Sequence, residues 1–198
     1  MSESRRIDRI DGTAVPVRGN NIDTDRIIPA RFLKAITFDG LGEHAFEDDR
    51  RSMPNHPFAN PSYVGASILL VNENFGSGSS REHAPQALMR WGIGACVGQS
   101  FSEIFLGNST TIGLPCATVE TEEVEALMSI VEQKPDTYLA FSVDALSITT
   151  ADRRVTVAIP HAVRESLLNG QWDATGLLLD QFDDVRRTAV ALPYVKGF

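Results

Sequence analysis

The chain has 198 residues, 42% of them hydrophobic and 22% charged, and its 18 basic and 26 acidic side chains give a net charge of −8. This composition predicts one soluble domain, residues 1–198, which is large enough to fold without a disulfide or a metal. The acidic balance argues against nucleic acid and anionic membranes as partners, because both require clustered Lys and Arg. No apolar stretch is long enough to span a bilayer, so we expect a cytoplasmic protein.

The first half of the chain alternates apolar runs with turn-rich segments. Residues 66–71 are apolar and β-branched, which predicts a strand buried on both faces. Residues 37–63 are rich in Gly, Pro, Asn and Asp, which predicts a long surface excursion. The same criteria predict further strands at 15–17, 95–97 and 114–119, and helices at 101–105 and 124–131.

A Gly-rich turn after residue 71 leads into a helix start. The residues Ser79-Ser80-Arg81-Glu82 fit the capping-box pattern, so the sequence predicts a helix that begins at Ser79 or Ser80. Pro85 fits this helix only in or near its first turn, where no intrahelical donor is needed. A capping box by itself indicates only a helix start, so a structural role and a binding role for this segment both remain open.

The second half of the chain is richer in strands. Residues 138–143, 146–149 and 155–159 are short apolar runs separated by turn residues, which predicts an antiparallel meander. Helices are expected at 162–168 and at 180–191, the latter beginning a C-terminal helix and tail that ends at residue 198. Alternating strands and helices followed by clustered strands predict an α/β fold with a mixed sheet.

The segment 74–83 has the features of a binding site. It connects a buried strand to a helix, and in open α/β sheets ligands bind at the carboxyl ends of the strands, where helix N-termini attract anions. Gly76 and Gly78 allow the backbone to approach a ligand closely, and Arg81 can hold a carboxylate through two hydrogen bonds. The segment therefore predicts recognition of a carboxylate or a phosphate.

Other residues that could carry chemistry have simpler interpretations. Asp23-Thr24-Asp25 could bind a hard cation, but it lacks further ligands, and a turn that caps its own backbone is the alternative. Cys96 lies in an apolar strand and is expected to be a buried small hydrophobe. With Cys116 it cannot complete a four-ligand thiolate site. Three histidines occur singly and are expected at the surface or in loops: His44, His56 and His161.

Three segments, 21–33, 74–85 and 100–105, resemble the small-subunit family of 3-isopropylmalate dehydratases in the aconitase superfamily. The most specific motif is Gly-Ser-Ser-Arg-Glu-His at 78–83. The resemblance implies a swivelling β/β/α domain with a mixed sheet, like the aconitase C-terminal domain. It also implies that this chain binds no cofactor alone and forms a heterodimer with a large subunit that carries a [4Fe-4S] cluster.

The resemblance further implies that the pair isomerises 2-isopropylmalate to 3-isopropylmalate by dehydration and rehydration, acting on a di- or tricarboxylate-type hydroxy acid. Ser79 matches the catalytic base of the family. Two alternatives stay open: a related dehydratase for citramalate or another alkylmalate, and a non-catalytic anion-binding module in which Ser79 only caps a helix. The matched substrate-binding residues are Gly78, Ser80 and Arg81, and the residues expected to support the site are Asp23, Thr24, Asp25, Arg31 and His83.

Overall fold

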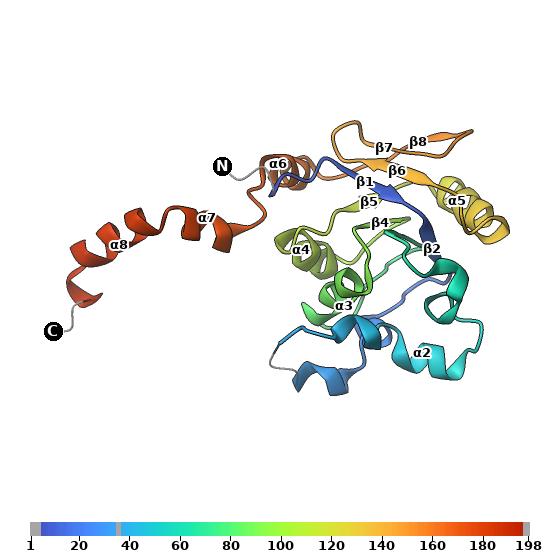
Figure 1. The fold of residues 1–198 in the computed structure, drawn as a ribbon, viewed down its shortest axis with the longest axis horizontal. Helices are drawn as coiled ribbons and strands as arrows, with labels where there is room; N and C mark the ends of the chain where they lie inside the picture. The colour runs from blue at the N-terminus through green and yellow to red at the C-terminus, as the bar shows by residue number, and fades with distance from the viewer. Residues whose placement is uncertain (1–4, 35–36, 196–198) are drawn as a thin grey trace.

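Two four-stranded sheets form the body of the protein in a computed structural model that describes residues 5–34 and 37–195 (Figure 1). One sheet is parallel and the other is antiparallel, so the predicted α/β fold with strands of both senses is confirmed, with one sense in each sheet. The parallel sheet contains, in order, β2 (Ala14–Val17), β3 (Ile68–Val71), β4 (Ala95–Gly98) and β5 (Cys116–Thr118). The antiparallel sheet contains, in order, β1 (Arg9–Gly12), β6 (Leu139–Ser142), β7 (Ser147–Thr149) and β8 (Arg154–Thr156).

The parallel sheet is the core of the protein. Every residue of β2, β3 and β4 is buried, as the continuous apolar runs predict for strands covered on both faces. The register places Val71 opposite both Val17 and Gly98, so the carboxyl ends of three strands lie at one edge. In Figure 1, α3 (His83–Trp91) and α4 (Glu103–Thr111) lie on one side of this sheet, and α5 (Thr121–Gln133) lies on the other.

The chain crosses between the sheets where β1 ends and β2 begins. β1 was not predicted, because Ile10 is the single apolar side chain among its four residues. The strand is accordingly only partly buried. Gly12 at the crossing has a φ of +148°, and a Cβ atom there would overlap the Ser67 side chain. An isolated bridge between Thr118 of β5 and Ala158 also joins the parallel sheet to the segment that follows β8.

The segment 37–63, predicted as a long surface excursion, lies in large part at the surface, but it forms a series of short helices and contributes some buried residues to the core. Phe46 and Phe58 are buried. His56 is also buried, at 4% exposed, and it lies in the loop before η4, one of the two positions expected for it. The short helices were not predicted because Gly and Pro also begin and end one-turn helices. These elements, with the two that precede them, are α1 (Thr24–Ile27), η2 (Ala30–Lys34), η3 (Leu41–His44), α2 (Glu47–Ser52), η4 (Pro57–Ala59) and η5 (Pro61–Tyr63), where η denotes a 3₁₀ helix.

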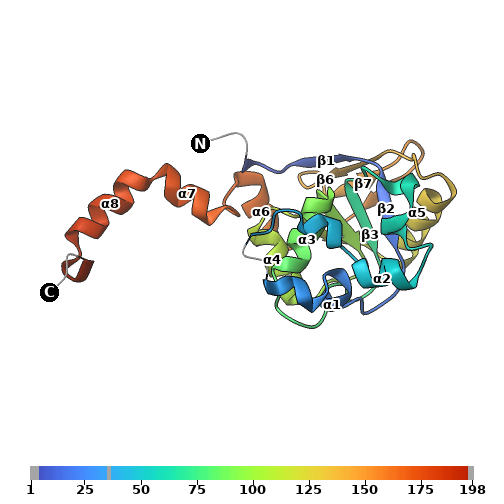
Figure 2. The same cartoon turned by 60° about the horizontal axis from the view of Figure 1, so that its bottom comes forward.

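The C-terminal helices leave the body. The predicted helices at 162–168 and 180–191 correspond to α6 (His161–Asn169) and α8 (Phe182–Ala191), while α7 (Ala174–Asp180) and η6 (Pro193–Val195) were not predicted. Figures 1 and 2 both show α7 and α8 extending as an arm away from the two sheets. Among the residues described, no helix combines the length and apolar character needed to cross a membrane.

Candidate active site

The turn that follows β3 requires glycine. Asn74, Gly76 and Gly78 all have positive φ, at 53°, 75° and 93°, a region that residues with a Cβ adopt at a cost. Gly76 is also in contact with α4, since a Cβ atom added there would lie only 2.6 Å from the Phe105 Cβ and closer still to its ring. The backbone therefore turns sharply at the sheet edge, in van der Waals contact with Phe105.

Helix α3 begins at His83, so the prediction of a start at Ser79 or Ser80 was wrong. Glu82 precedes the helix and its side chain makes no capping hydrogen bond. The physical reason is Pro85, which occupies the third position of the observed helix. In a helix starting at Ser80 it would occupy the sixth position, where its ring clashes with a carbonyl of the preceding turn and its missing N–H breaks the helix.

This late start leaves the preceding turn open to solvent. Gly78, Ser79 and Ser80 are exposed, and within the described part of the chain the two serine hydroxyls have no hydrogen-bond partner. The backbone N–H groups of Ser79, Ser80 and Glu82 likewise have no acceptor among residues 5–34 and 37–195. Because these donors lie just before a helix N-terminus, the turn presents a positive potential to an anion.

The segment 23–25 holds this turn in place through hydrogen bonds. Asp23 and Ser77 form a parallel bridge, and the Thr24 N–H donates to the Ser77 carbonyl at 2.9 Å. The Thr24 hydroxyl donates to the Ser79 carbonyl at 3.2 Å, and Thr24 is only 2% exposed. Asp23 also caps α1, since it accepts a hydrogen bond from the Arg26 N–H at 2.8 Å. The segment therefore caps its own backbone, as the sequence alternative stated, and also fixes the turn.

Asp25 and Arg81 connect the segment 23–25 to the turn through their charges. The Arg81 guanidinium pairs with the Asp25 carboxylate, and the Arg81 side chain is 17% exposed while that of Asp25 is 54% exposed. A guanidinium has five N–H donors, so Arg81 retains donors for a second carboxylate. Asp25 therefore orients Arg81 without using all of its donors.

Arg31 and His83, which were expected to support the site, contact residues outside the turn. Arg31 pairs with Glu47 at 3.2 Å and with Asp48 at 2.7 Å, and hydrogen bonding to Asp48 raises the pKa of Arg31. The His83 ring packs edge-on against Phe38 with ring centroids 5.1 Å apart. The His83 Nε2 atom is buried and has no hydrogen-bond partner within the part of the chain that the structure describes.

A second support comes from the residues after β4, which reasoning from the residue types did not identify. The Asn74 N–H donates to Ser100 Oγ at 2.8 Å, and the Phe75 N–H donates to the Ser100 carbonyl at 3.1 Å. The Ser102 hydroxyl donates to the Gly76 carbonyl at 2.6 Å and also caps α4. The available signal was that these serines follow a predicted strand at the edge where the turn lies.

The cysteines do not form part of this site. Cys96 and Cys116 are directly opposite in β4 and β5, and both are buried free thiols, which confirms the expectation for Cys96. Burial raises the pKa of the Cys96 thiol well above its ordinary value. No group of three or more His, Cys, Asp and Glu side chains that could hold a metal occurs among the described residues. These donors therefore do not fit an iron–sulfur cluster.

Comparisons with known proteins identify the family and the relatives of this chain. A family model described as the aconitase C-terminal domain matches residues 5–121. A 3-isopropylmalate dehydratase small subunit from Synechocystis sp. is 46% identical over 191 residues, 96% of this chain and 96% of that protein. A protein of the same name from Thermus thermophilus is 48% identical over 184 residues, 88% of this chain and 92% of that protein. The crystal structure of 3-isopropylmalate dehydratase from Methanocaldococcus jannaschii has a TM-score of 0.67 and 25% identity, and the match covers 88% of this chain and 99% of that one.

Proposed function

We propose a function from one premise: this chain belongs to the family of 3-isopropylmalate dehydratase small subunits, within the aconitase superfamily. It is the small subunit of a hydro-lyase of leucine biosynthesis, which isomerises 2-isopropylmalate to 3-isopropylmalate by dehydration and rehydration. The same membership gives the fold, an α/β domain of the aconitase C-terminal type.

A large subunit completes this enzyme, as the name of the relatives implies. We place the [4Fe-4S] cluster on that subunit, because the described residues of this chain do not fit it. In this proposal the two chains form a heterodimer in the cytoplasm, and the turn 78–81, in which Gly78, Ser79 and Ser80 are exposed, faces the large subunit. An exposed turn supports this arrangement, since a catalytic site needs a second surface to exclude water.

The Ser79 hydroxyl carries the proposed chemistry. It is exposed, it lies two residues before Arg81, and it makes no hydrogen bond with the described residues. We assign to it the removal of the proton from the substrate carbon next to a carboxylate. A serine hydroxyl is a weak acid, so its alkoxide requires fixed donors and positive charge nearby. The unpaired N–H groups of the turn and the Arg81 guanidinium can provide both.

The remaining residues of the turn bind the substrate in this proposal. Arg81 holds one substrate carboxylate with the donors that Asp25 leaves free, and the Ser80 hydroxyl and the Gly78 backbone add hydrogen bonds. The substrate is a hydroxy acid with at least two carboxylates. The local donors must attract it against the net charge of −8 carried by the whole chain.

The test is a two-chain assay. The purified chain is mixed with the iron–sulfur large subunit encoded in the same genome, and conversion of 2-isopropylmalate and of citramalate is followed. We expect turnover only with both chains and a higher kcat/KM for 2-isopropylmalate. Activity of this chain alone would refute the two-subunit proposal, and a preference for citramalate would change the substrate.

A serine variant tests the site. Ser79→Ala should lower kcat by about 10²- to 10⁴-fold, the usual contribution of a general base, while the two chains still associate. Ser62→Ala is the matched control, because Ser62 is an exposed serine of η5 whose hydroxyl has no assigned role. If Ser79→Ala retains full turnover and loses only stability, Ser79 has a structural role instead.

A further inference from the structure

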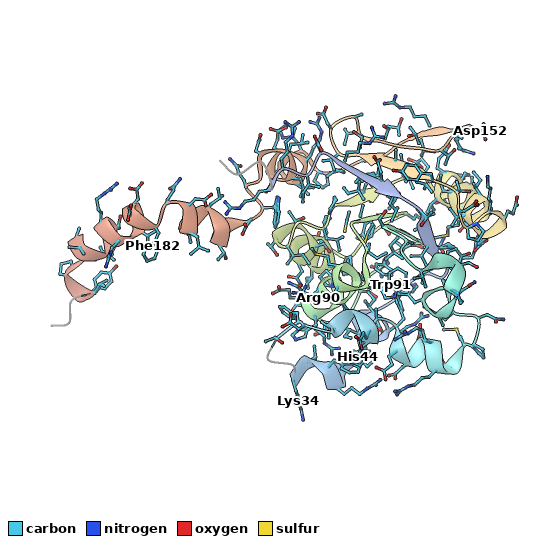
Figure 3. All side chains as sticks on the ribbon, viewed as in Figure 1. Lys34, His44, Arg90, Trp91, Asp152 and Phe182 are labelled. Carbon is cyan, nitrogen blue, oxygen red and sulfur yellow. The ribbon has the colours of Figure 1, made fainter. Side chains whose placement is uncertain are left out.

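The arm formed by α7 and α8 carries an exposed apolar stripe. On α8, Phe182, Val185 and Ala189 are spaced by three and four residues, which places them on one face of that helix. Leu192 continues this spacing at the C-cap, and Ala189 and Leu192 are half-buried. Figure 3 shows Phe182 on this arm, apart from the side chains of the body. The exposed fractions of the large apolar side chains are 60% for Leu178, 64% for Leu179, 56% for Phe182, 40% for Val185 and 58% for Val190.

The base of the arm is fixed to the body. The Trp172 indole N–H donates to the Arg5 carbonyl at 2.7 Å. The Arg5 guanidinium pairs with Asp173 at 2.8 Å and with Asp180 at 2.7 Å, at the two ends of α7. These contacts hold α7 in one direction, so α8 projects from the body with its apolar face toward solvent. An apolar stripe held in water by such a base is typical of a surface that binds another protein.

The arm and the active-site turn are connected through one helix. The Trp172 ring packs on Gly113, where a Cβ atom would lie 2.8 Å from the ring, and Gly113 follows the end of α4. At the other end of α4, Ser102 holds the Gly76 carbonyl. A helix rises about 1.5 Å per residue, so α4 spans roughly 14 Å, and the seventeen residues of α7 and α8 span roughly 25 Å. A partner that covers the turn therefore lies within reach of the arm.

Because α4 connects the arm to the turn, we propose that the apolar stripe of the arm docks on the large subunit, which the proposed function places over the turn 78–81. The partner surface is an apolar groove, because the side chains offered to it are leucine, phenylalanine and valine. The arm contributes affinity between the chains and takes no part in the chemistry, since it carries none of the residues of the turn.

Charged substitutions on α8 test this proposal with the full-length chain and the purified large subunit. Phe182→Asp and Val185→Asp place a carboxylate on the apolar stripe, and we expect the Kd for the large subunit to rise about tenfold or more, as for central interface residues. Ala191→Asp adds the same charge nine residues after Phe182, about half a turn away around the helix, and should change Kd less than about twofold. At saturating concentrations of the variants, kcat should return to the wild-type value.

The outcomes separate this proposal from the proposed function. If the wild-type chains associate and turn over but the stripe variants bind as tightly as wild type, the arm proposal is wrong and the function stands. If the wild-type chains neither associate nor turn over, the proposed function itself fails. If sedimentation shows that this chain alone is a dimer that Phe182→Asp dissociates, and the large subunit binds the variants unchanged, the stripe binds a second copy and the arm proposal is refuted.

Discussion

Substitution of Gly76 tests the claim that a close contact with α4 fixes the turn of the candidate active site. In Gly76→Ala, the new methyl group requires a residue with a side chain to adopt a φ of +75°, which costs about 1–2 kcal/mol. It also meets Phe105, whose Cβ is 2.6 Å from the added atom, and overpacking of this kind costs about 1–3 kcal/mol. We therefore expect a loss of about 2–5 kcal/mol in the free energy of unfolding.

Gly40 provides the matched control, because its φ of +73° is almost the same and nothing lies within 4 Å of the added methyl group. Gly40→Ala should therefore lose only the conformational cost, about 1–2 kcal/mol. The difference between the two variants, about 1–3 kcal/mol, isolates the contact with Phe105. Equilibrium unfolding in urea measures both variants. Equal losses would show that Phe105 moves aside freely and that the contact does not constrain the turn.

Three further variants address other parts of the site and the core. In His56→Asn the new side chain should still cap η4, as Asn60 caps η5. Because burial lowers the pKa of His56, the wild-type protein should lose free energy of unfolding as the pH falls below about 6.5, and the variant should lose less. Urea titrations at several pH values measure this, and parallel pH profiles for the two proteins would contradict it. Asp25→Asn should raise KM for 2-isopropylmalate more than it lowers kcat, since Arg81 loses its orienting partner; steady-state kinetics with both chains measure this, and an unchanged KM would exclude that role. Pro85→Ala should allow α3 to begin earlier, so that the backbone N–H groups of the turn become part of the helix and are no longer free to bind a ligand. We expect a lower kcat with an unchanged or increased free energy of unfolding. Unchanged kinetics would show that another feature sets the helix start.

The strands β2, β3 and β4 could be predicted from the sequence because burial on both faces requires a continuous run of apolar residues, whereas β1, which is only partly buried, was missed. The run at 66–71 and the meander at 138–159 required no knowledge of distant contacts. The segment 37–63 was misjudged because its turn residues were weighed and its buried aromatic residues, Phe46 and Phe58, were not.

The candidate site could likewise be predicted only in part. Its position after a buried strand and its exposed turn could be predicted, because Gly76 and Gly78 record the backbone geometry. The capping box by itself misplaced the helix start, although Pro85, three residues after it, was the sequence signal for the later start. The hydrogen bond from Thr24 to the Ser79 carbonyl spans 55 positions, and no local pattern contains such a separation.

The crossing of the chain from β1 to β2 has a consequence for the order of folding. Arg9 pairs with Ser142 in the antiparallel sheet, while Ala14, five residues later, pairs with Ile68 in the parallel sheet. During synthesis, β2 can therefore find its neighbour long before the partner of β1 has left the ribosome. Contacts between residues so far apart in sequence form late and slowly. We therefore expect β1 to remain unpaired while the parallel sheet assembles and to join β6 afterwards.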